Sequence, residues 1–307
     1  MRRQSLPAPF SARAFSTREA LAAGVPPTRL RASDLRAPHR GVRVVGEPQS
    51  LLDRCRELAP LLAPDEYFAH VTALGLFGVP LPWRAPAAAL HVGRPSGAPG
   101  RQRRRPGVIG HKLAPADLLD LDGLSVVSPV DAWLQSAAHL RLDDLVQLGD
   151  SLVGSWAEAS EVAQGLPLDQ LEDAVDTAKG RPGVALLREA ITLVRPGVES
   201  PKETALRLLL VRAGLPEPEI NVERFGADGS YLGKPDLSYS WCKVALEYEG
   251  DEHRRDRERW QRDITRRERF EHHGWRVVRV TERDLHPPYD RRLLDRVARL
   301  VNTAAPR

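Results

Sequence analysis

The sequence predicts an α/β protein of more than one domain, and three observations support this. The 307 residues exceed the roughly 100–200 residues of one average domain. Hydrophobic residues make up 42% of the chain, which is enough for packed cores. The pattern of helices and strands also changes twice along the chain. We therefore expect a winged helix-turn-helix at residues 1–46, an α+β domain with a helical connector at 47–195, and an α/β/α domain with a mixed sheet at 196–307.

Composition narrows the class of protein. No apolar run approaches the ~18–20 residues that cross a bilayer, and the N-terminus lacks the apolar stretch of a signal peptide. We expect a cytoplasmic protein without a membrane partner. Cys55 and Cys242 form no CxxC motif, so the sequence predicts neither a disulfide framework nor a zinc site. The net charge of +4 comes mostly from arginine, which fits either a compositional bias or nucleic-acid binding.

Capping signals define the N-terminal elements. Ser16 or Thr17 is placed to cap a first helix, which Gly24 ends. Thr28 is placed to cap a second helix, and the RGVRVV stretch that follows predicts a short strand. Helix, turn, helix and strand together outline a small winged helix-turn-helix.

Three arginines lie on the second of these predicted helices: Arg29, Arg31 and Arg36. A recognition helix presents side chains at such positions to DNA phosphates or base edges. The alternative is an ordinary helix with solvated arginines, and the sequence leaves both open.

The middle segment predicts helices and strands but no converging chemistry. We expect two strands, ALHVG and GVIGHK, joined by a Pro/Gly/Arg-rich loop that either contacts a phosphate backbone or caps a solvated hairpin. Helices are expected at 51–63, at 67–78, from Ser128 through 153, and at 180–197. His70, His91 and His111 are scattered along the chain, and we interpret them as structural residues.

The C-terminal segment follows the order α-β-β-β-α-β-α. Ser200 caps its first helix and Gly214 ends it. Glu203 occupies the capping-box position, three residues after Ser200, and also lies beside the buried stripe of this helix. INVERF predicts a strand that ends in a turn at ADGS.

A β-hairpin follows, made of KPDLSYS and KVALEYE. If Tyr239 pairs with Val244, Asp236 lies directly opposite Glu247 on the same face. Alternation along the second strand puts Glu249 on that face too. Clustered carboxylates repel one another and suit hard cations such as Mg²⁺ or Mn²⁺, which activate water and polarise phosphodiesters. Alternatively, Glu249 lies in solvent and Glu247 pairs with an arginine.

A long charged helix follows this hairpin, with its charges nearly balanced. His253 lies near the acidic residues at the start of the helix, where it is a candidate base or phosphate ligand. Arg254 and Arg267 on the same helix are candidates for neutralising a nucleic-acid backbone. A strand, WRVVRVT, and a helix, DRRLLDRVARLVN, close the chain.

The last ~110 residues resemble the PD-(D/E)XK nuclease superfamily, specifically the domain of unknown function 559 group, relatives of very-short-patch repair endonucleases. The matching features are Glu203, Pro235-Asp236, Glu247-Tyr248-Glu249-Gly250, His253, WQRDITRRE and GWRVVRVTERDL. The resemblance implies a restriction-endonuclease-like mixed sheet flanked by helices. It also implies a Mg²⁺ site at Asp236 and Glu247, assisted by Glu203.

One departure concerns position 249, where the superfamily's lysine is expected and Glu249 stands instead. In the implied site, Glu249 completes the metal shell or positions water, and His253 supplies the lysine's function. The N-terminal residues resemble, more weakly, the winged helix of abortive-infection-type antitoxins. The nuclease resemblance of the C-terminal segment implies a Mg²⁺- or Mn²⁺-dependent DNA endonuclease, with the N-terminal segment as its DNA-binding module. A non-catalytic, antitoxin-like DNA-binding regulator is the alternative, and RNA or branched DNA is another substrate class. DNA is the expected partner; a homodimer and a toxin partner are left open.

Overall fold

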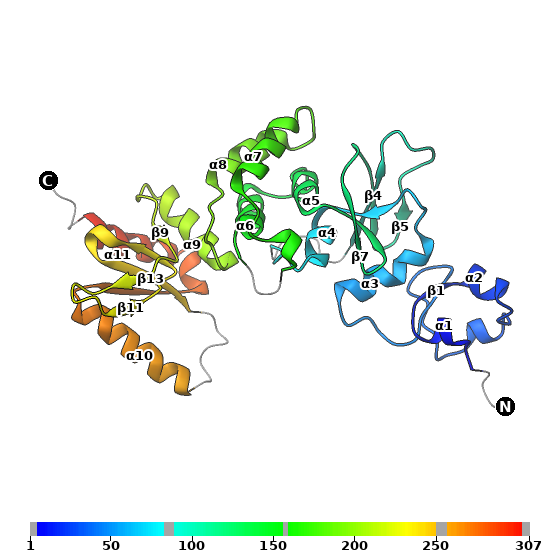
Figure 1. Cartoon of the computed structure of the whole chain (residues 1–307), viewed down its shortest axis with the longest axis horizontal. Helices are drawn as coiled ribbons and strands as arrows, with labels where there is room; N and C mark the ends of the chain where they lie inside the picture. The colour runs from blue at the N-terminus through cyan, green and yellow to red at the C-terminus, as the bar shows by residue number, and fades with distance from the viewer. Residues whose placement is uncertain (1–4, 83–88, 156–158, 250–256, 303–307) are drawn as a thin grey trace. The chain divides into compact units, whose positions relative to one another are not determined.

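The computed structural model describes residues 5–82, 89–155, 159–249 and 257–302 (Figure 1). Across these ranges the protein is a mixed α/β protein whose strands form a six-stranded mixed sheet, a four-stranded mixed sheet and two two-stranded ribbons. None of the described helices is long and apolar enough to span a membrane. The chain divides into two compact units, residues 1–140, 158–163 and 173–187, and residues 141–157, 164–172 and 188–307.

The first unit begins with α1 (Ala8–Ser11), β1 (Phe15–Ser16), α2 (Thr17–Ala22) and β2 (Val42–Arg43). The predicted first helix is confirmed as α2. The Ser16 hydroxyl accepts a hydrogen bond from the backbone N–H of Glu19, and Gly24 follows the helix with a φ of +82°. The predicted strand is confirmed as β2, which pairs antiparallel with β1.

The predicted second helix is wrong, because the chain makes only one 3₁₀ turn, η1 (Arg29–Arg31). Ala32 is already extended, with a ψ of 146°. A continuing helix would use the Leu30 carbonyl for a backbone N–H, but the Arg43 Nε donates to that carbonyl over 2.6 Å. The Arg43 side chain of β2 therefore occupies the acceptor that a longer helix after Thr28 would need.

The six-stranded sheet has the order β5-β6-β4-β3-β8-β7. Its strands are β3 (Tyr67–Phe68), β4 (Leu90–Pro95), β5 (Arg104–Arg105), β6 (Val108–Leu113), β7 (Leu118–Leu121) and β8 (Leu124–Val127). The two predicted strands ALHVG and GVIGHK are confirmed as β4 and β6, but the hairpin that the sequence left open for them is wrong, since they pair in parallel. The loop after β4 contains β5, which pairs antiparallel with β6 through a turn at Gly107. The chain has therefore reversed direction before it enters β6, and β6 runs parallel to β4.

The helices of the middle segment are α3 (Leu51–Leu58), η2 (Ala59–Leu61), α4 (His70–Leu76), α5 (Pro129–Ser136), α6 (Leu142–Val153), η3 (Glu161–Ala163), α7 (Leu168–Thr177) and α8 (Val184–Leu193). Ser128 caps α5 as predicted, and its hydroxyl accepts from the Asp131 N–H. The single helix expected from Ser128 through 153 is wrong. Arg141 is extended, and the Asp144 carboxylate accepts its N–H, so a new helix begins there.

The second unit contains α9 (Pro201–Arg212), β9 (Glu219–Ile220), β10 (Arg224–Phe225), β11 (Tyr231–Gly233), β12 (Leu237–Tyr239), η4 (Ser240–Cys242), β13 (Val244–Glu249), α10 (Arg257–His272), β14 (Arg276–Thr281), η6 (Glu282–Leu285) and α11 (Asp290–Asn302). The sheet order is β14-β13-β12-β9, with β13 and β14 parallel. INVERF is not one strand, because Asn221 adopts a φ of +48° and splits it into β9 and β10.

Two cores cover the two faces of this four-stranded sheet. Val244 and Leu246 face α9 and α11, in a core that Val278 of β14 also joins. Ala245 faces α10, where it packs with Phe270 in a second, smaller core. Figure 1 shows α10 on one face of the sheet and α11 on the other. The period-2 alternation predicted for β13 is therefore confirmed at the residues that fill these cores.

A buried ion pair joins α6 to α9 inside the second unit. Arg207 Nη2 lies 3.0 Å from Asp150 Oδ2, and both side chains are fully buried. The Asp150 carboxylate also accepts from the Thr204 hydroxyl and from the Arg195 N–H, each over 2.7 Å. Burial raises the pKa of Asp150, and the Arg207 charge and these donors act against that shift.

We predict that Asp150→Ala lowers the free energy of unfolding by about 3–5 kcal/mol, because it leaves the buried Arg207 guanidinium with only the partly exposed Glu217 as its counter-charge, and the Thr204 hydroxyl and the Arg195 N–H without their acceptor. Asp143→Ala is the matched control, since Asp143 also lies on α6 and pairs with Arg212 of α9, but both side chains are exposed. Losing the exposed Asp143–Arg212 ion pair should lower the free energy of unfolding by at most about 1 kcal/mol. Urea unfolding followed by tryptophan fluorescence measures both, and equal losses would contradict the prediction.

Candidate functional site

The register of the β12–β13 hairpin places two predicted acids together. Tyr239 pairs with Val244 as expected, and the ladder continues to Leu237 opposite Leu246. Asp236 and Glu247 occupy the next positions beyond this ladder. There the Asp236 carboxylate accepts a hydrogen bond of 2.6 Å from the Tyr248 N–H instead of continuing a backbone pair. The end of the ladder thus leaves the Asp236 carboxylate beside β13.

Glu203 reaches the same region from α9. The Ser200 hydroxyl caps α9 by accepting from the Glu203 N–H, as predicted. The predicted capping box is wrong, however, because the buried Glu203 carboxylate accepts from the Glu199 N–H at 2.8 Å, one residue before the cap. The Asn221 side chain donates to the same Glu203 oxygen at 2.6 Å, and the Asn221 N–H donates to the Asp236 carbonyl. Asn221 therefore ties Glu203 to Asp236.

Both of these carboxylates are destabilised as anions. Burial raises the pKa of Glu203, and the negative charge of Asp236 adds to that shift. Burial also raises the pKa of Asp236, against the opposing effects of the Tyr248 N–H and the Arg266 charge. Two neighbouring carboxylates with raised pKa values are an arrangement that a bound cation would relieve.

Arginines hold the two glutamates of β13. Glu247 forms an ion pair of 2.8 Å with Arg266 of α10, which was the alternative that the sequence left open. Glu249 forms one of the same length with Arg279 of β14, and both of these side chains are 40% exposed. Asp236, Glu247 and Glu249 do not converge as one ligand set in this arrangement. Histidine, cysteine, aspartate and glutamate can all ligate a metal. Among the described residues, the only three of these side chains whose ligand atoms all lie within 4.8 Å of one another are histidines.

The predicted N-terminal DNA contacts lie in different environments. Arg29 is buried and donates two hydrogen bonds to Asp34, over 2.7 and 3.0 Å. Arg36 forms an ion pair with Glu57 of α3. Arg31 is exposed. The guanidinium groups of Arg29 and Arg36 therefore serve contacts inside the unit, and the helix expected to present them is absent.

The remaining predicted residues belong to the segment after β13. His253 and Arg254 lie outside the residues that the structure describes. Arg267 is exposed on α10 and pairs with Glu271 one turn later, with 2.8 Å between Arg267 Nε and Glu271 Oε1. An exposed i,i+4 pair of this kind is weak, so Arg267 is available to an anionic ligand.

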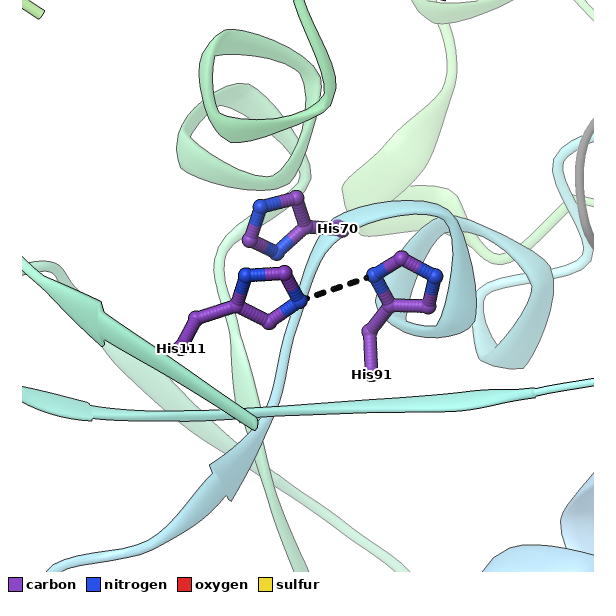
Figure 2. Close-up of side chains that lie close together, drawn as sticks. All are labelled: His70, His91 and His111. Atoms are coloured by element: carbon purple, nitrogen blue, oxygen red, sulfur yellow. Dashed lines mark hydrogen bonds between the residues drawn. The ribbon is translucent and has the colours of Figure 1, made fainter. Parts of the chain in front are cut away.

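Three histidines that the sequence interpretation called scattered form a cluster in the first unit. His70 begins α4, His91 lies on β4 and His111 lies on β6 (Figure 2). The His91 Nδ1 and the His111 Nε2 are 3.0 Å apart, and the rings of His70 and His111 stack with centroids 3.9 Å apart. The parallel pairing of β4 with β6 brings His91 beside His111, and that long-range pairing is what the sequence interpretation lacked.

Burial keeps the clustered rings neutral. Desolvation lowers the pKa of His70 to about 2, and that of His91 and of His111 to about 4. His70 and His91 are each only 2% exposed. The His70 Nδ1 and the His91 Nε2 have no hydrogen-bond partner within the described part of the chain.

The comparisons with known proteins return two distant relatives. The chain is 26% identical over 264 residues to the uncharacterized protein Rv2248 of Mycobacterium tuberculosis strain H37Rv. It matches the uncharacterized protein MT2308 of strain CDC 1551 to the same extent. Each alignment covers 86% of this chain and 91% of the relative. No protein-family model and no solved structure matches.

We predict that Asp236→Asn does not lower the stability of the metal-free protein near neutral pH, and raises it. Because the pKa of Asp236 is raised in the folded protein, the protein loses stability as pH rises above the ordinary value of 3.8 and through the folded pKa. Asparagine carries no charge at either pH, so the variant avoids this loss. The difference from the wild type should vanish well below pH 3.8. Thermal unfolding in EDTA across this pH range measures it.

Asp228→Asn provides the control of opposite sign. Hydrogen bonds from the Ser230 side chain and backbone lower the pKa of Asp228. Its contribution is present above pH 3.8 and is lost as pH falls through the lowered pKa, so this variant should be less stable than the wild type at neutral pH. A loss of stability at neutral pH in Asp236→Asn as large as that in Asp228→Asn would contradict the assignment of Asp236.

Proposed function

We propose that the second unit hydrolyses phosphodiester bonds in DNA with the help of Mg²⁺ or Mn²⁺. The observation that carries the proposal is the hairpin register, which puts Asp236 and Glu247 just beyond the Leu237–Leu246 pair, while Asn221 links the Glu203 carboxylate to the backbone of Asp236. The order of helices and strands around the mixed sheet supports it, because the PD-(D/E)XK nucleases that these residues resemble use such a frame. The proposal thus includes the restriction-endonuclease-like identity of this unit.

Asp236 and Glu247 are the proposed metal ligands. The raised pKa values of Asp236 and Glu203 fit a site completed by a cation. Clustered carboxylates with little solvent destabilise the metal-free protein, and a bound cation would offset that cost. When bound, the metal would supply Lewis-acid polarisation of the phosphate and a water of lowered pKa. Glu203 would orient the acids through Asn221.

Arg266 has a second role in the proposal. Its ion pair with Glu247 neutralises that carboxylate in the metal-free protein. Once a cation holds Glu247, the Arg266 guanidinium becomes available to a phosphate oxygen, which it can bind with two hydrogen bonds. Arg267, exposed on the same helix, would contact the DNA backbone and make binding weaken with salt.

Position 249 carries no lysine, and the basic group beside it is Arg279 of the neighbouring parallel strand. An arginine stays protonated and cannot act as a general base, so Arg279 would stabilise charge on the phosphate. Proton abstraction from water then falls to Glu249 or to His253.

A non-catalytic DNA-binding regulator is the second candidate. The Glu247–Arg266 ion pair favours it, because a cation must displace the guanidinium before Glu247 can ligate. In that case the unit would bind DNA through its arginines and leave the phosphodiester intact.

We predict that the purified chain nicks plasmid DNA with Mg²⁺ or Mn²⁺, and that Asp236→Ala lowers the rate at least about 100-fold. A metal contributes several kcal/mol to such a step, and 1.36 kcal/mol corresponds to tenfold in rate. Asp228→Ala is the matched control, since Asp228 lies in an exposed turn and should leave cleavage unchanged. Intact DNA binding without cleavage by wild type in either metal would favour the regulator.

Arg266→Ala separates the two roles of this arginine. Removing the competing cation should tighten Mn²⁺ binding by up to about fivefold, because a partly exposed ion pair contributes about 0.2–1 kcal/mol. Cleavage should nevertheless slow, because the phosphate loses its guanidinium. Calorimetric Mn²⁺ titration and the nicking assay report the two effects separately, and unchanged values in both would remove Arg266 from the mechanism.

A further inference from the structure

We propose that His70, His91 and His111 form a binding site for a divalent transition metal, with Zn²⁺ as the ion that fits them best. The site lies in the first unit and is separate from the carboxylates of the second. It rests on the placement of three side chains from three different elements, α4, β4 and β6 (Figure 2).

Their spacing suits a small ion. Zinc–nitrogen bonds of about 2.0–2.1 Å in a tetrahedral site put ligand nitrogens about 3.3 Å apart. The His91 Nδ1 and the His111 Nε2 already lie 3.0 Å apart. One nitrogen from each of the three rings lies within 4.8 Å of the others. Closing on an ion therefore requires shifts of at most about 1.5 Å between any two ligand atoms.

The hydrogen bond between His91 and His111 does not by itself satisfy the cluster. It leaves the His70 Nδ1 and the His91 Nε2 buried without a partner in the described ranges, and an ion bound between the rings would satisfy the first of these two atoms. In the metal-bound form the proton shared by His91 and His111 would move to an outer ring nitrogen. Both facing nitrogens would then offer lone pairs to the ion.

The backbone of His70 is a second, independent sign of a constrained site. His70 has a φ of +53°, a left-handed conformation that only a few per cent of non-glycine residues adopt. Such strain persists where the surroundings impose it, and it concentrates at binding and catalytic sites. Here it directs the first residue of α4 over the strands that carry His91 and His111.

The donor set selects the class of metal. Three neutral imidazoles suit zinc and its transition-metal neighbours, whereas Mg²⁺ and Ca²⁺ prefer oxygen ligands.

A cavity of about 810 Å³ opens beside the cluster, lined by His70 and His111 and also by Lys179 and Arg181. His139, exposed on this side, has its ring centroid 5.3 Å from that of His70. A three-histidine site with one position facing such a cavity has room for a water or an exogenous ligand on the metal.

The test is zinc binding by the full-length chain after removal of metals with EDTA. We expect one Zn²⁺ per chain in competition with a chromogenic chelator, and at least about 100-fold weaker binding in His91→Ala and His111→Ala. The second-layer partners of metal ligands are already worth 10–100-fold. His286→Ala, which removes an exposed histidine of the other unit, should bind zinc as the wild type does.

Two further measurements keep the outcome decisive. Co²⁺ added in place of zinc should give visible absorption bands of a tetrahedral nitrogen site in wild type, and zinc should raise the melting temperature of wild type but not of His111→Ala. Asp236→Ala should keep full zinc binding, which separates this site from the proposed nuclease. Wild type without stoichiometric zinc, or unchanged affinity in both histidine variants, overturns the proposal.

Discussion

The pairing of Tyr239 with Val244 is the constraint on which the second unit depends. It directs Leu246 into the core beneath α9 and α11, and it leaves Glu247 on the face of α10. A slip of one residue would turn every side chain of β13 to the opposite face and drive Glu247 into an apolar core. The same register ends the ladder at Leu237, so the Asp236 carboxylate is released to accept from a backbone N–H. Core packing thus fixes the position of the acids.

Arginine is the counter-charge used throughout the described chain. It neutralises a fully buried aspartate at Asp150, two glutamates on β13, and Asp34 and Glu57 near the N-terminus. Much of the arginine content is therefore committed to ion pairs within the chain, whose 41 acidic residues nearly balance its 45 basic ones. The pairs at Glu247 and Glu249 differ from the buried one because their arginines are partly exposed, so a cation or a phosphate can compete for them.

Local signals predicted the local structure well. The caps of α2, α5 and α9, the glycine stops and the hairpin of the second unit depend on residues close in sequence, and the structure has them. Some predictions failed for local reasons, such as the break at Arg141 and the left-handed Asn221, and others because they depended on distant partners. Arg43 ends the turn after Thr28 from a strand that lies later in the chain.

The histidine cluster depends on a parallel pairing that periodicity cannot reveal. His91 and His111 meet because β4 and β6 run in the same direction, with a crossover between them.

Another part of the first unit did carry a local signal. The Asp122-Gly123 dipeptide between two apolar runs is typical of the tight β7–β8 hairpin, which the sequence interpretation did not include.

A crystal structure with Mn²⁺ and its anomalous signal would test the proposed metal site most directly. We expect an anomalous peak beside the Asp236 and Glu247 carboxylates, the residues that would hold the ion. The Arg266 guanidinium should then have moved away from Glu247. An intact Glu247–Arg266 ion pair at saturating Mn²⁺, with no peak at these carboxylates, would contradict a metal-dependent nuclease in this unit.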